Sequence, residues 1–232
     1  MKYTFYILVC SALFLMTSCS ELDNFSEPNA SFKGNIVYNG ESIGVARNQV
    51  RFQLWQPGYE LTAPIDVAIA QDGSFSSRLF TGQYKLSFVP GQGPFKTVST
   101  DTIYFELTGD KVMDLDLTPY YMISNAQFTH SAGTINASCA LNKIISGVDE
   151  KTIESVTLVI NRTLFVDANS GAEGAIASAD AVDLSNLSSL NMSVVIPSDP
   201  TKPDQDYMFA RIGVKMTGVE DMIYTQVEKI TL

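Results

Sequence analysis

Apolar and polar residues alternate along most of the chain after residue 30, and a period of two is the pattern of β-strands with one buried face. Segment 84–88 shows it most cleanly, because Tyr84, Leu86 and Phe88 share one face while two polar residues share the other. The first half of the chain is predicted to contain seven strands, at 31–38, 49–55, 65–70, 74–80, 83–89, 102–107 and 111–117. Turns separate them at 39–40, 72–73, 81–82 and 109–110. Short strands at this spacing predict a β-sandwich.

A second set of strands follows Thr118-Pro119-Tyr120-Tyr121, where the proline is expected to end the preceding ladder and mark a joint between domains. These strands are predicted at 122–130, 133–141, 155–166, 190–196, 207–216 and 224–231. Residues 167–189 are expected to form a long loop with one helical turn at 174–181, and residues 148–153 a short helix. The chain is therefore predicted to be all-β, with tandem β-sandwiches at 31–118 and 119–232.

The first eighteen residues have the pattern of a lipoprotein signal peptide. Lys2 supplies a positive start, and the apolar stretch 5–16 is too short to span a bilayer. Met16-Thr17-Ser18-Cys19 resembles a bacterial lipobox, which implies cleavage before Cys19 and lipid attachment to that cysteine. An ordinary secretory signal with a chance cysteine is the alternative. Residues 19–30 are then expected to form a lipidated tether.

Acidic residues follow that cysteine in Ser20-Glu21-Leu22-Asp23-Asn24. They resemble the export signal that sends lipoproteins of Bacteroidetes-type bacteria to the outer face of the outer membrane. The resemblance implies a lipid-anchored protein of the outer membrane that faces the cell exterior, with retention in the periplasm as the alternative.

The amino-acid composition argues against several classes of function. The 232 residues include 15 Lys and Arg against 25 Asp and Glu, and this net charge of −10 argues against a nucleic-acid partner. One histidine, His130, argues against a His-ligated metal site or a Ser-His-Asp triad. The sequence contains no Gly-x-Ser-x-Gly elbow, phosphate-binding loop or zinc-protease motif. We therefore expect a protein that is not an enzyme and has no cofactor or metal site.

Two segments of the first half carry a resemblance to a known fold. Gln71-Asp72-Gly73-Ser74-Phe75 and Thr81-Gly82-Gln83-Tyr84-Lys85-Leu86 resemble the strand-turn-strand signature of carboxypeptidase-regulatory-like, transthyretin-type sandwiches. Phe32-Lys33-Gly34-Asn35-Ile36-Val37 resembles the first strand of that fold. The resemblance covers residues 31–118 and implies a fold but not a function.

The chain after Cys19 also resembles an uncharacterised family of two-domain Bacteroidetes surface lipoproteins. The likeness is carried by Leu22-Asp23-Asn24-Phe25-Ser26-Glu27-Pro28-Asn29-Ala30, by Phe32-Lys33-Gly34 and by Leu117-Thr118-Pro119-Tyr120. Genes of this family often lie beside SusC/SusD-type glycan-uptake systems, which implies SusC/SusD-type proteins and polysaccharide as partners. The second domain would then be an immunoglobulin- or fibronectin-like sandwich.

Aromatic residues in turns are the candidate sugar contacts, because a pyranose ring presents an apolar C–H face and a rim of hydroxyls. Trp55 is the only tryptophan, and the following Pro-Gly turn is expected to display it beside Tyr59. Phe95, in the loop 91–96, is a third candidate. Phe52 and Leu54 are expected to face the core, so Trp55 falls on the opposite face, although packing near the core is the alternative.

Two further residues are singled out by their context. Asp101-Thr102-Ile103 matches a short acceptor motif for O-glycosylation in this bacterial group, with a strand role for Thr102 as the alternative. Cys139 lies in the alternating segment 134–141 and is expected to face the core.

These observations predict a non-catalytic outer-membrane surface lipoprotein, accessory to a SusC/SusD-type system, that binds glycan or acts as a scaffold. The alternative is a fimbrial or adhesin-type structural subunit, since fimbrial proteins of the same bacteria are also lipoproteins built from two transthyretin-like sandwiches and polymerise by strand donation.

Overall fold

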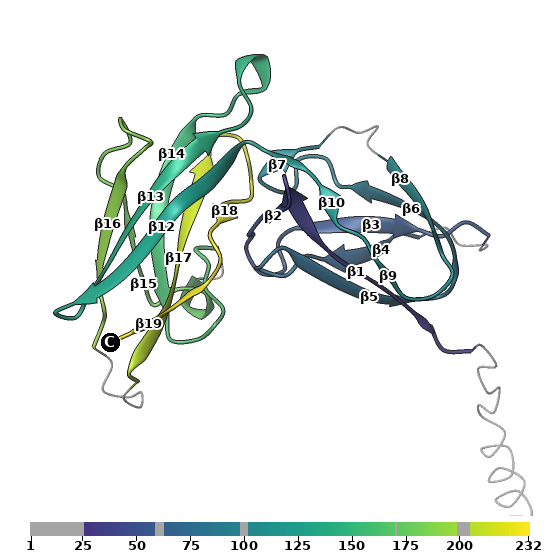
Figure 1. Cartoon of the computed structure of the whole chain (residues 1–232), viewed down its shortest axis with the longest axis horizontal. Coiled ribbons are helices and arrows are strands. Elements are labelled where there is room, and N and C mark those ends of the chain that lie inside the picture. Colours follow the sequence, from purple (N-terminus) through teal and green to yellow (C-terminus); the bar gives the residue numbers. More distant parts are fainter. Residues whose placement is uncertain (1–25, 59–62, 98–101, 170, 199–204) are drawn as a thin grey trace, which may run out of the picture.

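The computed structural model of the chain consists of two β-sandwiches lying side by side (Figure 1). It describes residues 26–58, 63–97, 102–169, 171–198 and 205–232. Within these ranges the helical elements are two single-turn 3-10 helices, Gly147–Asp149 and Gly171–Glu173. The predictions of an all-β chain and of two tandem sandwiches are confirmed.

The first sandwich has one sheet built around β1 (Ala30–Tyr38). This strand pairs antiparallel with β2 (Glu41–Ser42) and β5 (Ser74–Leu79), and parallel with β9 (Lys111–Val112) and β10 (Leu115–Asp116). The opposing sheet is antiparallel and has the order β4-β3-β6-β8. Its strands are β4 (Ile65–Ala68), β3 (Arg51–Trp55), β6 (Gly82–Phe88) and β8 (Thr102–Leu107).

Aromatic rings fill the space between these two sheets. The centroid of the Phe32 ring lies 6.4 Å from that of Phe52, 5.2 Å from that of Phe75 and 4.6 Å from that of Phe105. Tyr84 stacks on the other side of Phe105 at 5.6 Å, and its hydroxyl donates to the Phe80 carbonyl at 2.8 Å. Most inward side chains of β3, β6 and β8 are thus used by the core, with Ile103 at the start of β8 as the exposed exception, and the outward ones are available for binding.

The second sandwich divides its strands as immunoglobulin- and fibronectin-like domains do. One sheet has the order β12 (Tyr121–Ser131), β13 (Thr134–Lys143) and β16 (Leu190–Val195). The other runs β15 (Ala177–Asp180), β14 (Ile153–Asn161) and β17 (Tyr207–Met216), and β17 also pairs with β18 (Ile223–Tyr224) and β19 (Glu228–Thr231).

Cys139 of β13 is 2% exposed within this sandwich, as expected for a core-facing residue. Burial raises the pKa of its thiol to about 11. The thiol therefore stays protonated at neutral pH and behaves as a small apolar side chain.

Segment 174–181 does not contain the expected helical turn. Residues 177–180 form strand β15, which pairs with residues 157–160 of β14, and the Thr157 hydroxyl hydrogen-bonds the Asp180 carboxylate. The helical preference of alanine is worth only a few tenths of a kcal/mol per residue, so pairing with a neighbouring strand overrides it. A 3-10 turn does form, but earlier, at Gly171–Glu173.

The chain crosses between the sandwiches beside a two-stranded pairing of β7 (Phe95–Lys96) with β11 (Thr118–Pro119). Pro119 lies opposite Phe95, and the Tyr120 amide donates to the Pro94 carbonyl at 3.2 Å. Lys96 continues the contact by an ion pair with Asp149 at 2.8 Å. The connection is therefore held to the body of the first sandwich.

Arg211 of β17 is fully buried at the interface between the two domains. Its guanidinium donates to Val45 and Gln71 carbonyls of the first domain at 3.0 and 2.8 Å. It also donates to Val166 and Thr225 carbonyls of the second domain at 3.2 and 2.7 Å. Burial lowers the pKa of Arg211 to about 10, with nearby Asp167 and Asp72 charges opposing the shift, so the group stays cationic at neutral pH.

The backbones of the two domains approach each other closely beside Arg211. The Tyr224 ring lies under the guanidinium at 4.6 Å, and its amide donates to the Gly44 carbonyl at 2.9 Å. A Cβ atom on Gly44 would lie 2.4 Å from the Tyr224 carbonyl oxygen and 2.8 Å from Arg211 Nη2. Only glycine therefore permits this approach of the two backbones.

The substitution Arg211→Met is expected to lower the free energy of unfolding by about 3 kcal/mol, because four buried carbonyl groups lose a charged donor at once. Urea denaturation followed by the fluorescence of Trp55 provides the measurement. Since Trp55 lies in the first domain and Arg211 in the second, a lowered midpoint also reports coupling across the interface.

Lys143→Met is the matched control, because Lys143 belongs to the second domain and its ion pair with Glu150 is solvent-exposed. That change is expected to lower the urea midpoint far less than Arg211→Met does, because an exposed ion pair contributes little to stability. Equal midpoints for the two variants would contradict a central role for Arg211.

Candidate functional site

The outward side of the β4-β3-β6-β8 sheet carries two aromatic side chains that the core does not use. Trp55 lies opposite Lys85, and Lys85 lies opposite Tyr104, so the three form one row across β3, β6 and β8. We call this row and its outward polar neighbours the aromatic face; the neighbours are Gln53, Gln83, Ser87, Thr102 and Glu106. Adjacent strands lie about 4.8 Å apart, which separates the backbones at Trp55 and Tyr104 by about 10 Å.

The two rings differ in how they are held. Tyr104 is 74% exposed, more than any other large apolar or aromatic side chain of the first domain's described part except Val112. Trp55 is half-buried, and its indole Nε1 donates to the Ser87 hydroxyl at 3.3 Å. Trp55, Pro57, Gln83, Tyr84, Lys85 and Tyr104 line a shallow hollow of about 320 Å³. The face thus offers one fixed ring, one exposed ring and a hollow between them.

Polar groups continue the face toward β4. Gln53 donates to the Asp66 carboxylate at 3.1 Å, and Arg51 lies 3.4 Å from the same carboxylate. Ser87 and Thr102 lie side by side in the register of β6 and β8. An apolar ring beside hydroxyl, amide and charged groups is the combination that a sugar requires, because its C–H face stacks and its hydroxyls form hydrogen bonds.

The site residues predicted from the sequence differ in how well their observed positions agree with the prediction. Trp55 is on the outward face, as expected. Phe95 is 2% exposed, because β7 pairs with β11 and the ring packs against Phe88 at 5.4 Å, so its proposed exposure in a loop is wrong. Tyr59 and Cys19 lie outside the described residues. Thr102 begins β8 and is half-buried on the aromatic face, and nothing tests its modification.

Tyr104 is absent from the residues that the sequence singled out, although the alternation in 102–107 contains the information. Phe105 and Leu107 are buried, so the residue between Ile103 and Phe105 must point outward. An aromatic residue at an outward strand position is the signal that identifies it.

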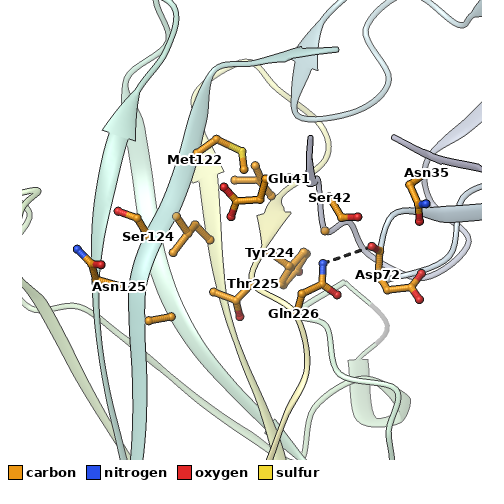
Figure 2. Close-up of a pocket in the computed structure, with 14 residues that line it drawn as sticks. Asn35, Glu41, Ser42, Asp72, Met122, Ser124, Asn125, Tyr224, Thr225 and Gln226 are labelled. Atoms are coloured by element: carbon orange, nitrogen blue, oxygen red, sulfur yellow. Dashed lines mark hydrogen bonds between the residues drawn. The ribbon is translucent and has the colours of Figure 1, made fainter. Parts of the chain in front are cut away.

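A second concave surface lies between the domains (Figure 2). This groove has a volume of about 580 Å³ and lies between β2 and the Asp72 turn of the first domain and β12 and β18 of the second. Figure 2 shows Gln226 Nε2 donating to the Asp72 carbonyl, at 3.3 Å, across its lower end. A β-bulge displaces β12 from its partner between Ser124 and Gln127 and holds Asn125 at a φ of 52°.

The groove contains fewer charged and aromatic groups that could contact a ligand than the aromatic face does. Burial alone would raise the pKa of Asp72, but hydrogen bonds from the Ser74 hydroxyl and amide outweigh this and lower it, so that carboxylate is engaged within its own turn. Glu41 is the remaining carboxylate among the lining residues, and none of them is basic. The groove follows from the way in which Arg211 and Gly44 join the domains, and it contains no exposed aromatic ring.

We also searched the described residues for metal ligands, for an available histidine and for a membrane-spanning helix. No group of three or more His, Cys, Asp or Glu side chains is arranged to hold a metal ion among them. His130 Nε2 accepts a hydrogen bond from the Gly133 amide at 3.2 Å, within the β12–β13 hairpin. In the same part of the chain, no helix has the length and apolar character needed to cross a membrane.

Comparison with protein families finds two adjoining matches. Residues 30–118 match the protein of unknown function (DUF3823) N-terminal domain, and residues 121–229 match the domain of unknown function DUF3823_C. Comparison with curated proteins finds no match.

Solved structures from Bacteroides and Parabacteroides species share the two-domain arrangement. A DUF3823 family protein from Bacteroides ovatus ATCC 8483 is 32% identical, with a TM-score of 0.77 over 88% of this chain and 100% of that one. One from Parabacteroides merdae ATCC 43184 is also 32% identical, with a TM-score of 0.76 over 89% of this chain and 100% of that one. A candidate carbohydrate-binding protein from Bacteroides uniformis ATCC 8492 is 19% identical, with a TM-score of 0.69 over 88% and 100%.

Tyr104→Ala is expected to change the free energy of unfolding by less than about 1 kcal/mol, because the ring contributes little to the core. Phe105→Ala, at the adjacent inward position, is expected to cost about 3–5 kcal/mol. Urea denaturation of both variants measures the difference. A large loss of stability in Tyr104→Ala would mean that this ring has a structural role instead.

Proposed function

This chain belongs to the DUF3823 family, and from that premise and the geometry of the aromatic face we propose that it is a non-catalytic carbohydrate-binding protein. The observation that carries the proposal is the row of Trp55, Lys85 and Tyr104 on the outward face of one sheet. Sugar rings of a single polysaccharide chain would stack on the two aromatic rings, and the neighbouring hydroxyl and amide groups would bind sugar hydroxyls.

Two further observations support this assignment. Tyr104 and Trp55 share one outward face, and tyrosine and tryptophan are enriched at binding interfaces because each combines an apolar ring with a polar group. The Bacteroides uniformis protein of the same fold is itself a candidate carbohydrate-binding protein, although its identity of 19% supports the fold alone.

The cellular setting forms part of the proposal. Lipid on Cys19 would anchor the protein in the outer membrane with its domains facing the cell exterior, where polysaccharide arrives. There it would serve a SusC/SusD-type uptake system by retaining glycan near the transporter. The second sandwich would hold the first at a fixed orientation through Arg211.

A fimbrial subunit remains the alternative, and the topology of β1 argues against it. Polymerisation by strand donation after proteolytic trimming requires an element that the fold can lose. Trimming of this kind occurs at a basic residue, and Lys33 is the first basic residue of the described chain. Lys33 lies inside β1, and β1 pairs with four other strands of its sheet. Cleavage there would remove the centre of the first domain's sheet.

The test is retardation in native gels that contain polysaccharides, with calorimetric titration of those that retard the protein. The chain from Ser26 onward, which carries both family domains, is run against neutral and anionic polysaccharides of plant and host origin. Trp55→Ala and Tyr104→Ala are each expected to weaken binding about tenfold, because each ring would bury apolar sugar surface worth on the order of 1.4 kcal/mol.

Phe165→Ala is the matched control, because Phe165 is an exposed aromatic residue of the second domain, 44% accessible, whose ring contacts Arg47, which is not part of the aromatic face. Its binding is expected to equal that of the unchanged protein. Binding that survives both Trp55→Ala and Tyr104→Ala would overturn the assignment of this face.

A further inference from the structure

Lys85 occupies the centre of the aromatic face. It is the register partner of Trp55 on β3 and of Tyr104 on β8, so its side chain projects between the two rings. Lys85 is exposed. The ion pairs within the described residues are Arg47–Glu173, Arg51–Asp66, Lys96–Asp149 and Lys143–Glu150, and Lys85 takes part in none of them.

The other charges on this sheet face are arranged differently. Arg51 is paired with Asp66, which also accepts a hydrogen bond from Gln53. Glu106 lies opposite Gln83, one row beyond Tyr104 and diagonal to Lys85. A positive charge is therefore available at the point where a sugar held between the two rings would lie, while the outward carboxylate of β8, that of Glu106, occupies the next row.

This position contrasts with the protein as a whole, whose net charge is −10. A surface with that excess of carboxylates disfavours an anionic polymer almost everywhere. For a neutral glycan, a lysine between the rings adds no more than another hydroxyl or amide would. For an anionic glycan it supplies the one charge-assisted hydrogen bond that offsets the surrounding carboxylates.

We propose that the aromatic face selects an acidic polysaccharide, in which two sugar rings stack on Trp55 and Tyr104 while the carboxylate or sulfate of the sugar between them pairs with Lys85. This inference rests on the proposed function, since the rings must first hold the chain. The separation of about 10 Å between the two aromatic backbones leaves space for that intervening sugar.

The experiment compares pairs of glycans that share a backbone and differ only in charge. One pair is oligogalacturonate and the same oligosaccharide after its carboxyl groups have been reduced to hydroxymethyl groups. The other pair is dextran sulfate and dextran, which separates recognition of sulfate from recognition of carboxylate. Titrations at 0.15 M salt limit the contribution of distant charges, because the Debye length is then about 8 Å.

Lys85→Gln is expected to weaken binding of the recognised anionic glycan about fivefold, the upper range for an exposed ion pair, and to leave its neutral counterpart within twofold. Lys85→Arg is expected to restore most of the affinity, because it restores the charge. Glu106→Gln is expected to strengthen anionic binding about twofold, which gives a change of opposite sign on the same face.

The outcomes separate this inference from the proposed function. Neutral glycans bound at least as tightly as their anionic counterparts, with loss in Trp55→Ala, would leave the carbohydrate-binding face in place and overturn the selection by Lys85. Anionic binding unchanged in Lys85→Gln would overturn it as well. No binding of either pair or of any polysaccharide in the wider panel, or binding that ignores Trp55→Ala and Tyr104→Ala, would overturn the function itself.

Discussion

The hydrogen bonds of Arg211 determine how the two halves of this protein are joined. A buried guanidinium is stable only when its donors are used, and here the acceptors are divided between two carbonyls of each domain. Neither sandwich alone could supply the full set. The backbone at Gly44 and the ring of Tyr224 cover the remaining sides of the Arg211 guanidinium. The buried charge of Arg211 therefore depends both on the lack of a side chain at Gly44 and on the aromatic ring of Tyr224. The interdomain groove and the fixed orientation of the aromatic face both follow from this joint.

The aromatic face depends on a simpler constraint, the alternation of side chains across a twisted sheet. The core uses most inward positions of β3, β6 and β8, with Phe52, Tyr84 and Phe105 among them. Side chains at the outward positions do not pack in the core, so they are available to bind a ligand. The same register that builds the core therefore also sets the distance between Trp55 and Tyr104 and places Lys85 between them.

Period-two alternation was sufficient to predict the long strands and the two sandwiches, because most long strands have one buried face, although β14 and β17 are buried on both faces over much of their length. It could not reveal two-residue pairings such as β7 with β11, which lack enough residues to show a period. Phe95 was misassigned for this reason: a glycine-rich segment resembles a loop until its pairing with Pro119 is known. Arg211 could not be recognised either, because its side chain points away from the core of its own sandwich and its acceptors come from both domains. Tyr104, by contrast, could have been found from the alternation alone.

The division of acceptors around Arg211 also bears on how such a chain can change during evolution. Tandem sandwiches in other proteins are often exchanged as independent modules, since their linkers carry few contacts. Here a transplanted second domain would bring a cation whose partners had stayed behind, and a transplanted first domain would present carbonyls at Val45 and Gln71 with no donor. The two domains are therefore expected to be inherited and duplicated as one unit. Amino-acid substitutions are expected to be tolerated more often on outward strand faces than at the interface between the domains.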